Sequence, residues 1–258
     1  MSFVRRRVAG LVLCLVASSA AFIFLSAAAQ KRAVPAQEND PPTPIQEGVM
    51  GDKQKKHSKL YKGSRWYTKG KKIKDAIAER GDVEIHAPLL DPIGRPAPPL
   101  AEFLRRQTCA ADLVVLGIVR NKASQLTEDG SFIFTDYEIA VEEVLKNNQV
   151  APASQGDDIT VTRYGGAVEL NGHVARATDP AMGLLRAGET YLLYLKFLHE
   201  TGAYRPIGGG LAEDTFRIQG EKIEQVSNKL WPFGRRATGD AALFLWEAHN
   251  ALKGQCTK

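Results

Sequence analysis

Histidine, cysteine and serine are the residue types in this sequence best suited to metal binding or nucleophilic chemistry. No two histidines stand four residues apart, none lies in an H-E-x-x-H pattern, and no G-x-S-x-G motif occurs. We therefore expect no metal, no cofactor and no catalytic activity. The alternative is a hydrolase whose Asp, Glu or His side chains converge only in the folded core. The five histidines are His57, His86, His173, His199 and His249.

The first thirty residues have the order of a secretory signal peptide. Three arginines at positions 5–7 precede an apolar run over residues 8–25, and small residues follow up to Ala29. We predict a signal peptide over residues 1–29, cleaved before Gln30, and hence an exported protein, periplasmic or secreted. The alternative is an uncleaved N-terminal membrane anchor, because the apolar run counted to Ala29 is long enough to span a bilayer.

Two of the three cysteines, Cys109 and Cys256, lie outside the predicted signal peptide. An even number of cysteines in an oxidising compartment favours a disulfide bond. Such a bond would close a loop to which the chain-entropy model assigns about 4–5 kcal/mol of stabilisation. Two free thiols are the alternative.

The segment that follows the signal peptide is basic and rich in proline, with 16 Lys and Arg against 10 Asp and Glu over residues 31–107. We expect residues 30–107 to be a largely disordered linker, apart from a short helix over residues 71–80 and a helical turn over residues 100–106. Residues 108–258 hold 15 basic and 19 acidic side chains. The basic leader could therefore also fold back on this acidic core.

Residues 53–74 of the leader carry ten Lys and Arg and no acidic residue, with Tyr61, Trp66 and Tyr67 between them. Cations interleaved with aromatic rings are typical of segments that bind an anionic surface. We predict docking on anionic lipid or polysaccharide of the envelope, and export makes nucleic acid the least expected partner. The alternative is a solvated, mostly disordered segment that only prevents aggregation. The predicted contact residues are Lys53, Lys55, Lys56, Lys59, Lys62, Arg65, Trp66, Lys69, Lys71, Lys72 and Lys74.

The composition, 44% apolar and 24% charged, is that of a folded protein of one or two domains. Residues 108–258 contain short strand patterns separated by glycine turns, followed by a helix over residues 240–252. Because one helix cannot cover a parallel sheet, we predict a mainly β fold, a small barrel or sandwich with a C-terminal helix. A slip in the apolar alternation near Asp136 predicts a bulge or bend. The expected strands cover residues 113–119, 132–144, 159–163, 167–170, 190–198, 204–207, 214–218 and 222–226, with Asn171 and Gly172 as a hairpin turn.

Residues 109–115 (CAADLVV) combine a Cys, a short Ala-Asp step and paired valines. Further on come YEI at residues 137–139, VLK at residues 144–146 and GETYLL at residues 188–193. Together these motifs resemble the netrin-like module, the OB-type barrel of tissue inhibitors of metalloproteinases. The chain is also similar to exported bacterial proteins to which no activity is assigned. The resemblance covers about residues 108–198. It implies that the domain over residues 108–258 is an OB-like barrel, with Cys109 as a structural disulfide cysteine.

The resemblance does not imply protease inhibition. Inhibitors of that family chelate the protease zinc through an amino-terminal Cys, whereas the matching Cys109 is internal in this chain. We predict an exported, non-enzymatic binding or interaction module, whose partner is an unknown protein or envelope component. OB-type barrels bind ligands on one face. The candidate ligand face holds Arg163, Tyr164 and Arg176, near a pair of glycines at 165–166 that would let the backbone approach a ligand.

Overall fold

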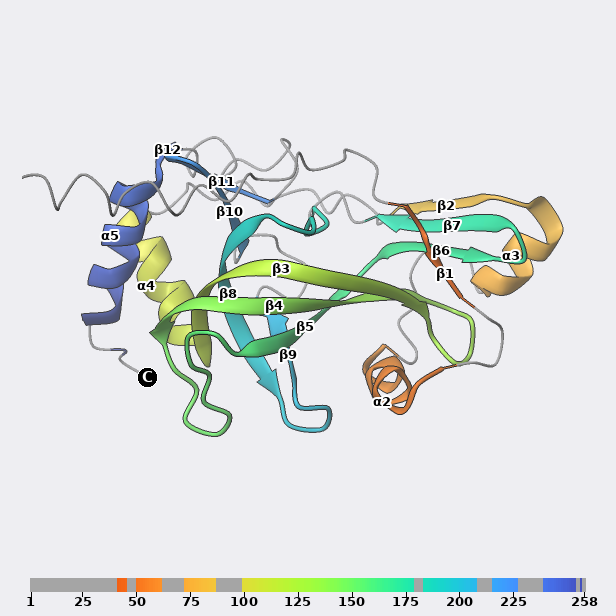
Figure 1. The fold of residues 1–258 in the computed structure, drawn as a ribbon, viewed down its shortest axis with the longest axis horizontal. Helices are drawn as coiled ribbons and strands as arrows, with labels where there is room; N and C mark the ends of the chain where they lie inside the picture. Colours follow the sequence, from red (N-terminus) through yellow and green to blue (C-terminus); the bar gives the residue numbers. More distant parts are fainter. Residues whose placement is uncertain are drawn as a thin grey trace, which may run out of the picture. The chain divides into compact units, whose positions relative to one another are not determined.

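Two β-sheets form the framework of the protein in the computed structural model (Figure 1). The larger sheet has eight strands and the smaller has four, and a helix follows the last strand. This confirms a mainly β fold with a C-terminal helix. The structure describes residues 41–45, 50–61, 72–86, 99–178, 183–207, 215–226, 239–253 and 256.

Five strands of the larger sheet form a barrel-like ring. They are β3 (Leu113–Leu126), β4 (Ile133–Lys146), β5 (Asp158–Tyr164), β8 (Thr190–Leu198) and β9 (Ala203–Pro206). β3 pairs with β4 and β8, β4 pairs with β5, and β8 pairs with β9, all antiparallel. The ring closes where β5 and β9 meet in parallel at Val161 and Tyr204. This ring is the barrel-like part of the fold.

Three further strands extend the larger sheet beyond β8: β10 (Thr215–Gln219), β11 (Lys222–Gln225) and β12 (Gly239–Asp240). They lead to helix α5 (Ala241–Lys253), which confirms the expected C-terminal helix to within one residue. Asp240 caps α5, because its Oδ1 accepts the backbone N–H of Leu243 at 2.8 Å. Helix α4 (Leu100–Ala110) contacts α5, and both pack against the outside of the ring.

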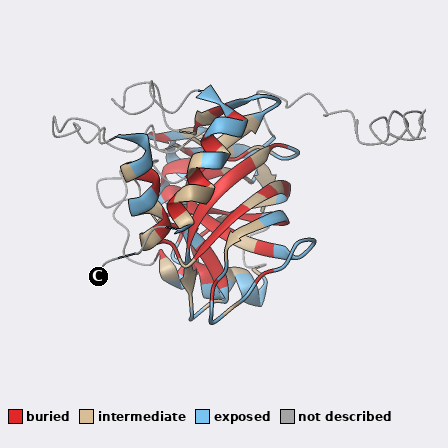
Figure 2. Cartoon of the chain, turned by 90° about the vertical axis from the view of Figure 1, so that its left-hand side faces the viewer, coloured by how far each residue is buried: buried red, intermediate tan, exposed pale blue. Residues whose placement is uncertain are grey.

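Most of the sheet is buried (Figure 2), and strand β8 is buried on both faces from Tyr191 to Leu195. Leu193 and Leu195 belong to the apolar core inside the ring. Leu192 and Tyr194 alternate with them and pack on the other side, together with Phe244 of α5. Burial on two sides explains why this strand shows an apolar run rather than a polar alternation.

The predicted bulge near Asp136 lies not in β4 itself but in its partner strand β3, opposite Glu138 and Ile139. Pairing between β4 and β5 is regular on both sides of Asp136. The irregularities lie instead in the pairing of β3 with β4, the last of them between Val119 and Asn121 of β3. The apolar pattern slips because the buried face of β4 changes: Phe134 packs outside the ring, whereas Tyr137 packs inside it.

The smaller sheet combines a hairpin of the predicted core domain with two strands of the predicted leader. β6 (Gly166–Leu170) and β7 (His173–Thr178) form the hairpin, and its turn has left-handed backbone at Asn171 (φ 54°) and Gly172 (φ 77°), as predicted. β1 (Thr43–Pro44) and β2 (Val83–His86) pair in parallel with β6 and β7, respectively. Ile73 and Ile77 of helix α3 (Ile73–Arg80) pack against this sheet.

The expectation that residues 30–107 form a largely disordered linker is wrong for the described parts of that segment. They contain β1, helix α2 (Asp52–Leu60), α3, β2 and most of α4, which crosses the predicted domain boundary at residue 108. Helix α3 confirms the expected helix over residues 71–80. The buried residues of α2, His57 and Ser58, are polar and lie between lysines, so the sequence contains no apolar run that would indicate them. The predicted signal peptide lies outside the described residues.

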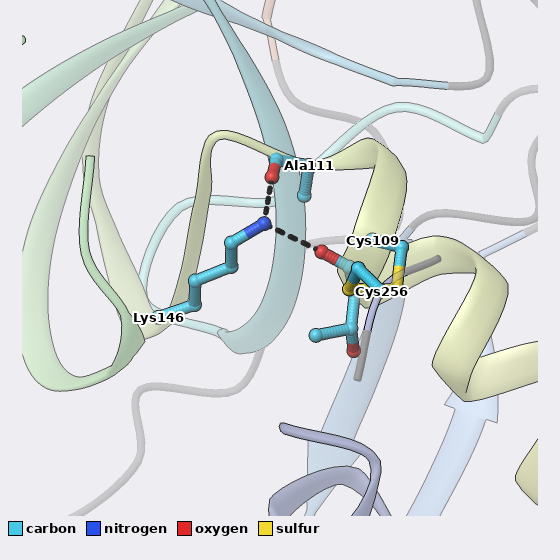
Figure 3. The surroundings of a disulfide bond; sticks show 5 residues. Cys109, Ala111, Lys146 and Cys256 are labelled. Atoms are coloured by element: carbon cyan, nitrogen blue, oxygen red, sulfur yellow. Dashed lines mark hydrogen bonds between the residues drawn. A yellow bond between two sulfur atoms is a disulfide. The ribbon is translucent and has the colours of Figure 1, made fainter. Parts of the chain in front are cut away.

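The predicted disulfide joins Cys109 to Cys256, with their Cα atoms 5.5 Å apart and a sequence separation of 147 (Figure 3). Cys109 lies in the last turn of α4, and β3 begins only at Leu113. Beside the bond, Lys146 Nζ donates hydrogen bonds to the backbone oxygens of Thr108 and Ala111. These carbonyls at the end of α4 have no partner within the helix, so Lys146 satisfies them.

Candidate functional site

Helix α2 carries four of the predicted basic contact residues and is anchored on the outer face of β4 and β5. Its contacts come from Lys53, His57 and Tyr61, the residue that caps its C-terminus. Residues four positions apart lie on one side of a helix, so these three side chains form a single stripe. The hydrogen-bonded pairs are Lys53–Thr160 (2.7 Å), His57–Asp136 (2.7 Å) and Tyr61–Thr162 (2.8 Å).

The central pair, His57 and Asp136, is buried between helix and sheet. The imidazole Nδ1–H donates to the carboxylate Oδ2. The other polar atoms, His57 Nε2 and Asp136 Oδ1, are shielded from solvent and form no hydrogen bond within the described structure. Removing one partner of a buried hydrogen bond leaves the other group unsatisfied, which costs about 1–3 kcal/mol and more for a carboxylate. The pair therefore fixes the position of α2 on the sheet.

An imidazole oriented by a carboxylate is also the arrangement of a general base in hydrolases. The alternative function considered from the sequence would need such a pair. Here, however, the Nε2 atom that would reach a substrate is sealed from solvent. The geometry is that of an anchor between a helix and a sheet.

Four aromatic rings surround the end of α2. Tyr61 stacks on Phe134, with ring centroids 5.1 Å apart, and on Phe132 at 5.6 Å. Tyr164 meets the Tyr61 ring edge-on at 5.2 Å. Burial raises the pKa of the Tyr61 hydroxyl well above its usual range, so the group stays protonated and available to Thr162. The cluster adds apolar burial to the polar anchor.

Helices α2 and α3 also hold the turn between β3 and β4. The hydroxyl of Ser58 in α2 accepts the backbone N–H of Glu128 at 3.0 Å. The backbone N–H of Ile73 in α3 donates to the carbonyl of Gly130 at 2.8 Å. The two helices therefore contact the same turn, two residues apart.

The outer side of α2 is basic. Lys55, Lys56 and Lys59 are exposed, whereas His57 and Ser58 are buried. Lys55 Nζ lies 3.9 Å from the carboxylate of Asp52, at the limit of an ion pair on the surface. The structure also places Lys72 and Lys74 as exposed residues at the start of α3. The other predicted contact residues, Lys62, Arg65, Trp66, Lys69 and Lys71, lie outside the described residues.

The structure does not bring Arg163, Tyr164 and Arg176 to one face. Tyr164 contacts Tyr61 outside the ring, whereas Arg163, the preceding residue of β5, points to the other side of the sheet and is only 4% exposed. Arg176 is exposed on β7. The neighbouring glycines serve packing within the protein, because a Cβ on Gly166 would lie 2.2 Å from the Thr135 hydroxyl.

Sequence reasoning missed the pairing of His57 with Asp136. The two residues are 79 positions apart, and neither lies in a recognisable motif. One local signal was available, since Lys53, His57 and Tyr61 recur every fourth residue, as expected for the buried side of a short helix. The residues of β4 and β5 that bond to these three side chains show no such pattern in the sequence.

Within the ranges that the structure describes, no three His, Cys, Asp or Glu side chains gather as metal ligands. None of the helices described there is long and apolar enough to cross a membrane, and the alternative anchor at residues 8–29 lies outside them. No protein-family model matches the chain, and no curated protein matches it significantly.

Proposed function

We propose that the protein is an exported binding module that docks on an anionic lipid surface through the outer side of helix α2. The orientation of α2 is the observation that most supports this function. His57 and Tyr61 anchor its inner side on the sheet, which leaves Lys55, Lys56 and Lys59 directed away from the ring. Export rests on the predicted signal peptide, and the OB-like ring serves as the scaffold.

The electrostatic attraction expected from this surface is large enough to matter. A Lys held near an anionic membrane contributes about 1 kcal/mol, so three lysines together contribute about 3 kcal/mol. That free energy corresponds to more than about a hundredfold in affinity. Charges on a folded helix also avoid the ordering cost that a disordered segment would have on binding. Binding should weaken with salt, because exposed charges are screened within about 10 Å at 0.1 M ionic strength.

Vesicle co-sedimentation tests the proposal. The full chain is mixed with neutral phosphatidylcholine vesicles, or with vesicles that also contain anionic phosphatidylglycerol, at low and moderate salt. The test variant replaces Lys55, Lys56 and Lys59 by Gln. The matched control removes the same number of charges from other exposed positions through Lys222→Gln, Lys253→Gln and Arg176→Gln.

We expect the wild type and the control to sediment with anionic vesicles only, and the α2 variant to stay in solution. Equal retention of both triple variants would contradict a site on α2, because it would show that only net charge matters. A soluble anionic polysaccharide is added as a competitor in a separate arm. Tighter binding to that polymer than to the vesicles would replace lipid by polysaccharide as the partner.

A further inference from the structure

Arg163 is a buried charged side chain whose terminal nitrogens have no hydrogen-bond partner among the described residues. It is 4% exposed, and its two terminal nitrogens, Nη1 and Nη2, are shielded from solvent. A guanidinium remains protonated in proteins and offers five N–H donors. The buried charge is therefore not neutralised within the described structure.

The hydroxyls on the same side of the sheet are already engaged. Arg163 stands opposite Thr135 of β4, and directly opposite residues of an antiparallel pair share a face. The Thr135 hydroxyl donates to the carbonyl of Gly165 at 2.6 Å and lies 2.8 Å from the Ser124 hydroxyl. The Ser124 oxygen in turn accepts the backbone N–H of Ala167 at 3.3 Å. These groups bond to one another rather than to the guanidinium.

The nearest carboxylate along β4 faces the other way. Asp136 follows Thr135 in the strand, so its side chain lies on the opposite face, where it bonds to His57. Arg163 therefore sits at the junction where β5 ends and β6 begins, without an anion supplied by its described neighbours. A buried charge in that state is strongly destabilising, and such a group calls for an ion of opposite charge.

We propose that Arg163 is the binding residue of an oxyanion site at the junction of β5 and β6, which takes a carboxylate or a phosphate group. The planar fork of a guanidinium pairs with either group through two parallel N–H···O bonds. The site is closed in this structure, so the ion enters during a local opening of the residues around it. This site lies apart from the basic side of α2 and does not depend on the function proposed for that helix.

Thermal unfolding at constant ionic strength tests the site. The full chain is unfolded in chloride buffer with increasing inorganic phosphate, sulfate or acetate, which separates phosphate-like from carboxylate ligands. A ligand that binds only the folded state raises Tm in proportion to ln(1 + [L]/Kd). At about 100 times Kd, we expect the Tm of a chain of this size to rise by at least about 5 °C.

Three variants identify the residue responsible. Arg163→Met should lose the rise in Tm, and it should be no less stable than the wild type in chloride, because an unpaired buried charge has been removed. Arg163→Lys retains the charge without the fork and should show a smaller rise. The exposed Arg176→Met should behave as the wild type. An equal rise in Arg163→Met, or no rise in the wild type with any of the three anions, would overturn the site.

Calorimetric titration of the folded wild type and Arg163→Lys with phosphate and with acetate at 25 °C provides a second measurement. It does not depend on how stable each variant is. Saturable binding to the wild type that is at least about tenfold weaker in Arg163→Lys would support the site. Equal binding by both proteins would overturn it.

Discussion

Helices cover the outside of the ring in two places, and they are held in different ways. Helices α4 and α5 pack through an apolar cluster that includes Phe103, Phe216 and Phe244, and the bond between Cys109 and Cys256 closes that end covalently. Helix α2, in contrast, is held on β4 and β5 by side-chain hydrogen bonds beside a small aromatic cluster. The difference indicates that α2 can open while the ring and the disulfide end stay folded.

The disulfide should have the largest effect on stability. The double variant Cys109→Ser/Cys256→Ser should lose about 2–5 kcal/mol in free energy of unfolding, because a loop of 147 residues is no longer closed in the unfolded chain. Urea unfolding of the variant and of the oxidised wild type measures this. Reduced wild type is the control and should match the variant. A loss below about 1 kcal/mol would mean that the apolar packing alone secures this end.

Replacing His57 should release α2. His57→Ala leaves the buried carboxylate of Asp136 without its hydrogen-bond partner. This should lower the free energy of unfolding by about 3 kcal/mol, unless the helix moves away and admits water. We expect hydrogen exchange over residues 52–61 to rise to that of an open segment, with little change in α4. His249→Ala is the matched control, because its pair with Glu143 is exposed and is worth at most about 1 kcal/mol. If exchange in α4 rises as much as in α2, the two regions unfold together and the comparison fails.

Removing one hydroxyl from the anchor should have an intermediate effect. Tyr61→Phe keeps the ring contacts with Phe134 and loses the hydrogen bond to Thr162, which is worth about 1 kcal/mol. The same loss should appear in Thr162→Val. The double variant should lose about as much stability as either single variant, because both changes remove the same hydrogen bond. Additive losses in this double-mutant cycle, followed by exchange over residues 52–61, would show that the two hydroxyls do not act together.

Acid should weaken the disulfide end slightly, through Asp112. Burial alone would raise the pKa of this carboxyl, but hydrogen bonds from Lys196 and from the backbone N–H of Phe197 outweigh it, so the pKa lies below its usual range. A lowered pKa in the folded state gives stability above the unfolded value of about 3.9, and that stability disappears as the pH falls through the folded value.

Because Asp112 is partly exposed, its contribution should be at most about 1 kcal/mol. Asp112→Asn should flatten the fall in stability measured between neutral pH and pH 3. An unchanged pH profile in this variant would assign the acid sensitivity to other carboxyls.

The two regions also differ in how far the sequence predicts them. Strand β8 was predicted to the residue, because burial on two sides leaves an apolar run, and α5 and its Asp240 cap follow from helical spacing and a capping residue. The pairing of Cys109 with Cys256 follows from their even number. Helix α2 was missed because its stability depends on Asp136 and Thr162, more than 75 residues further along the chain. A lysine-rich segment whose buried residues are polar has no local pattern that distinguishes it from a linker.

Hydrogen exchange of the full-length wild type at neutral pH tests the central claim, that α2 is a folded part of the domain. Peptides that cover residues 52–61 should be protected, less strongly than peptides of β8 but well above the rate of an unstructured chain. Loss of that protection in His57→Ala, with β8 and α4 unchanged, would show that the buried pair holds the helix. Unprotected exchange over residues 52–61 in the wild type would contradict the account and restore the disordered basic leader.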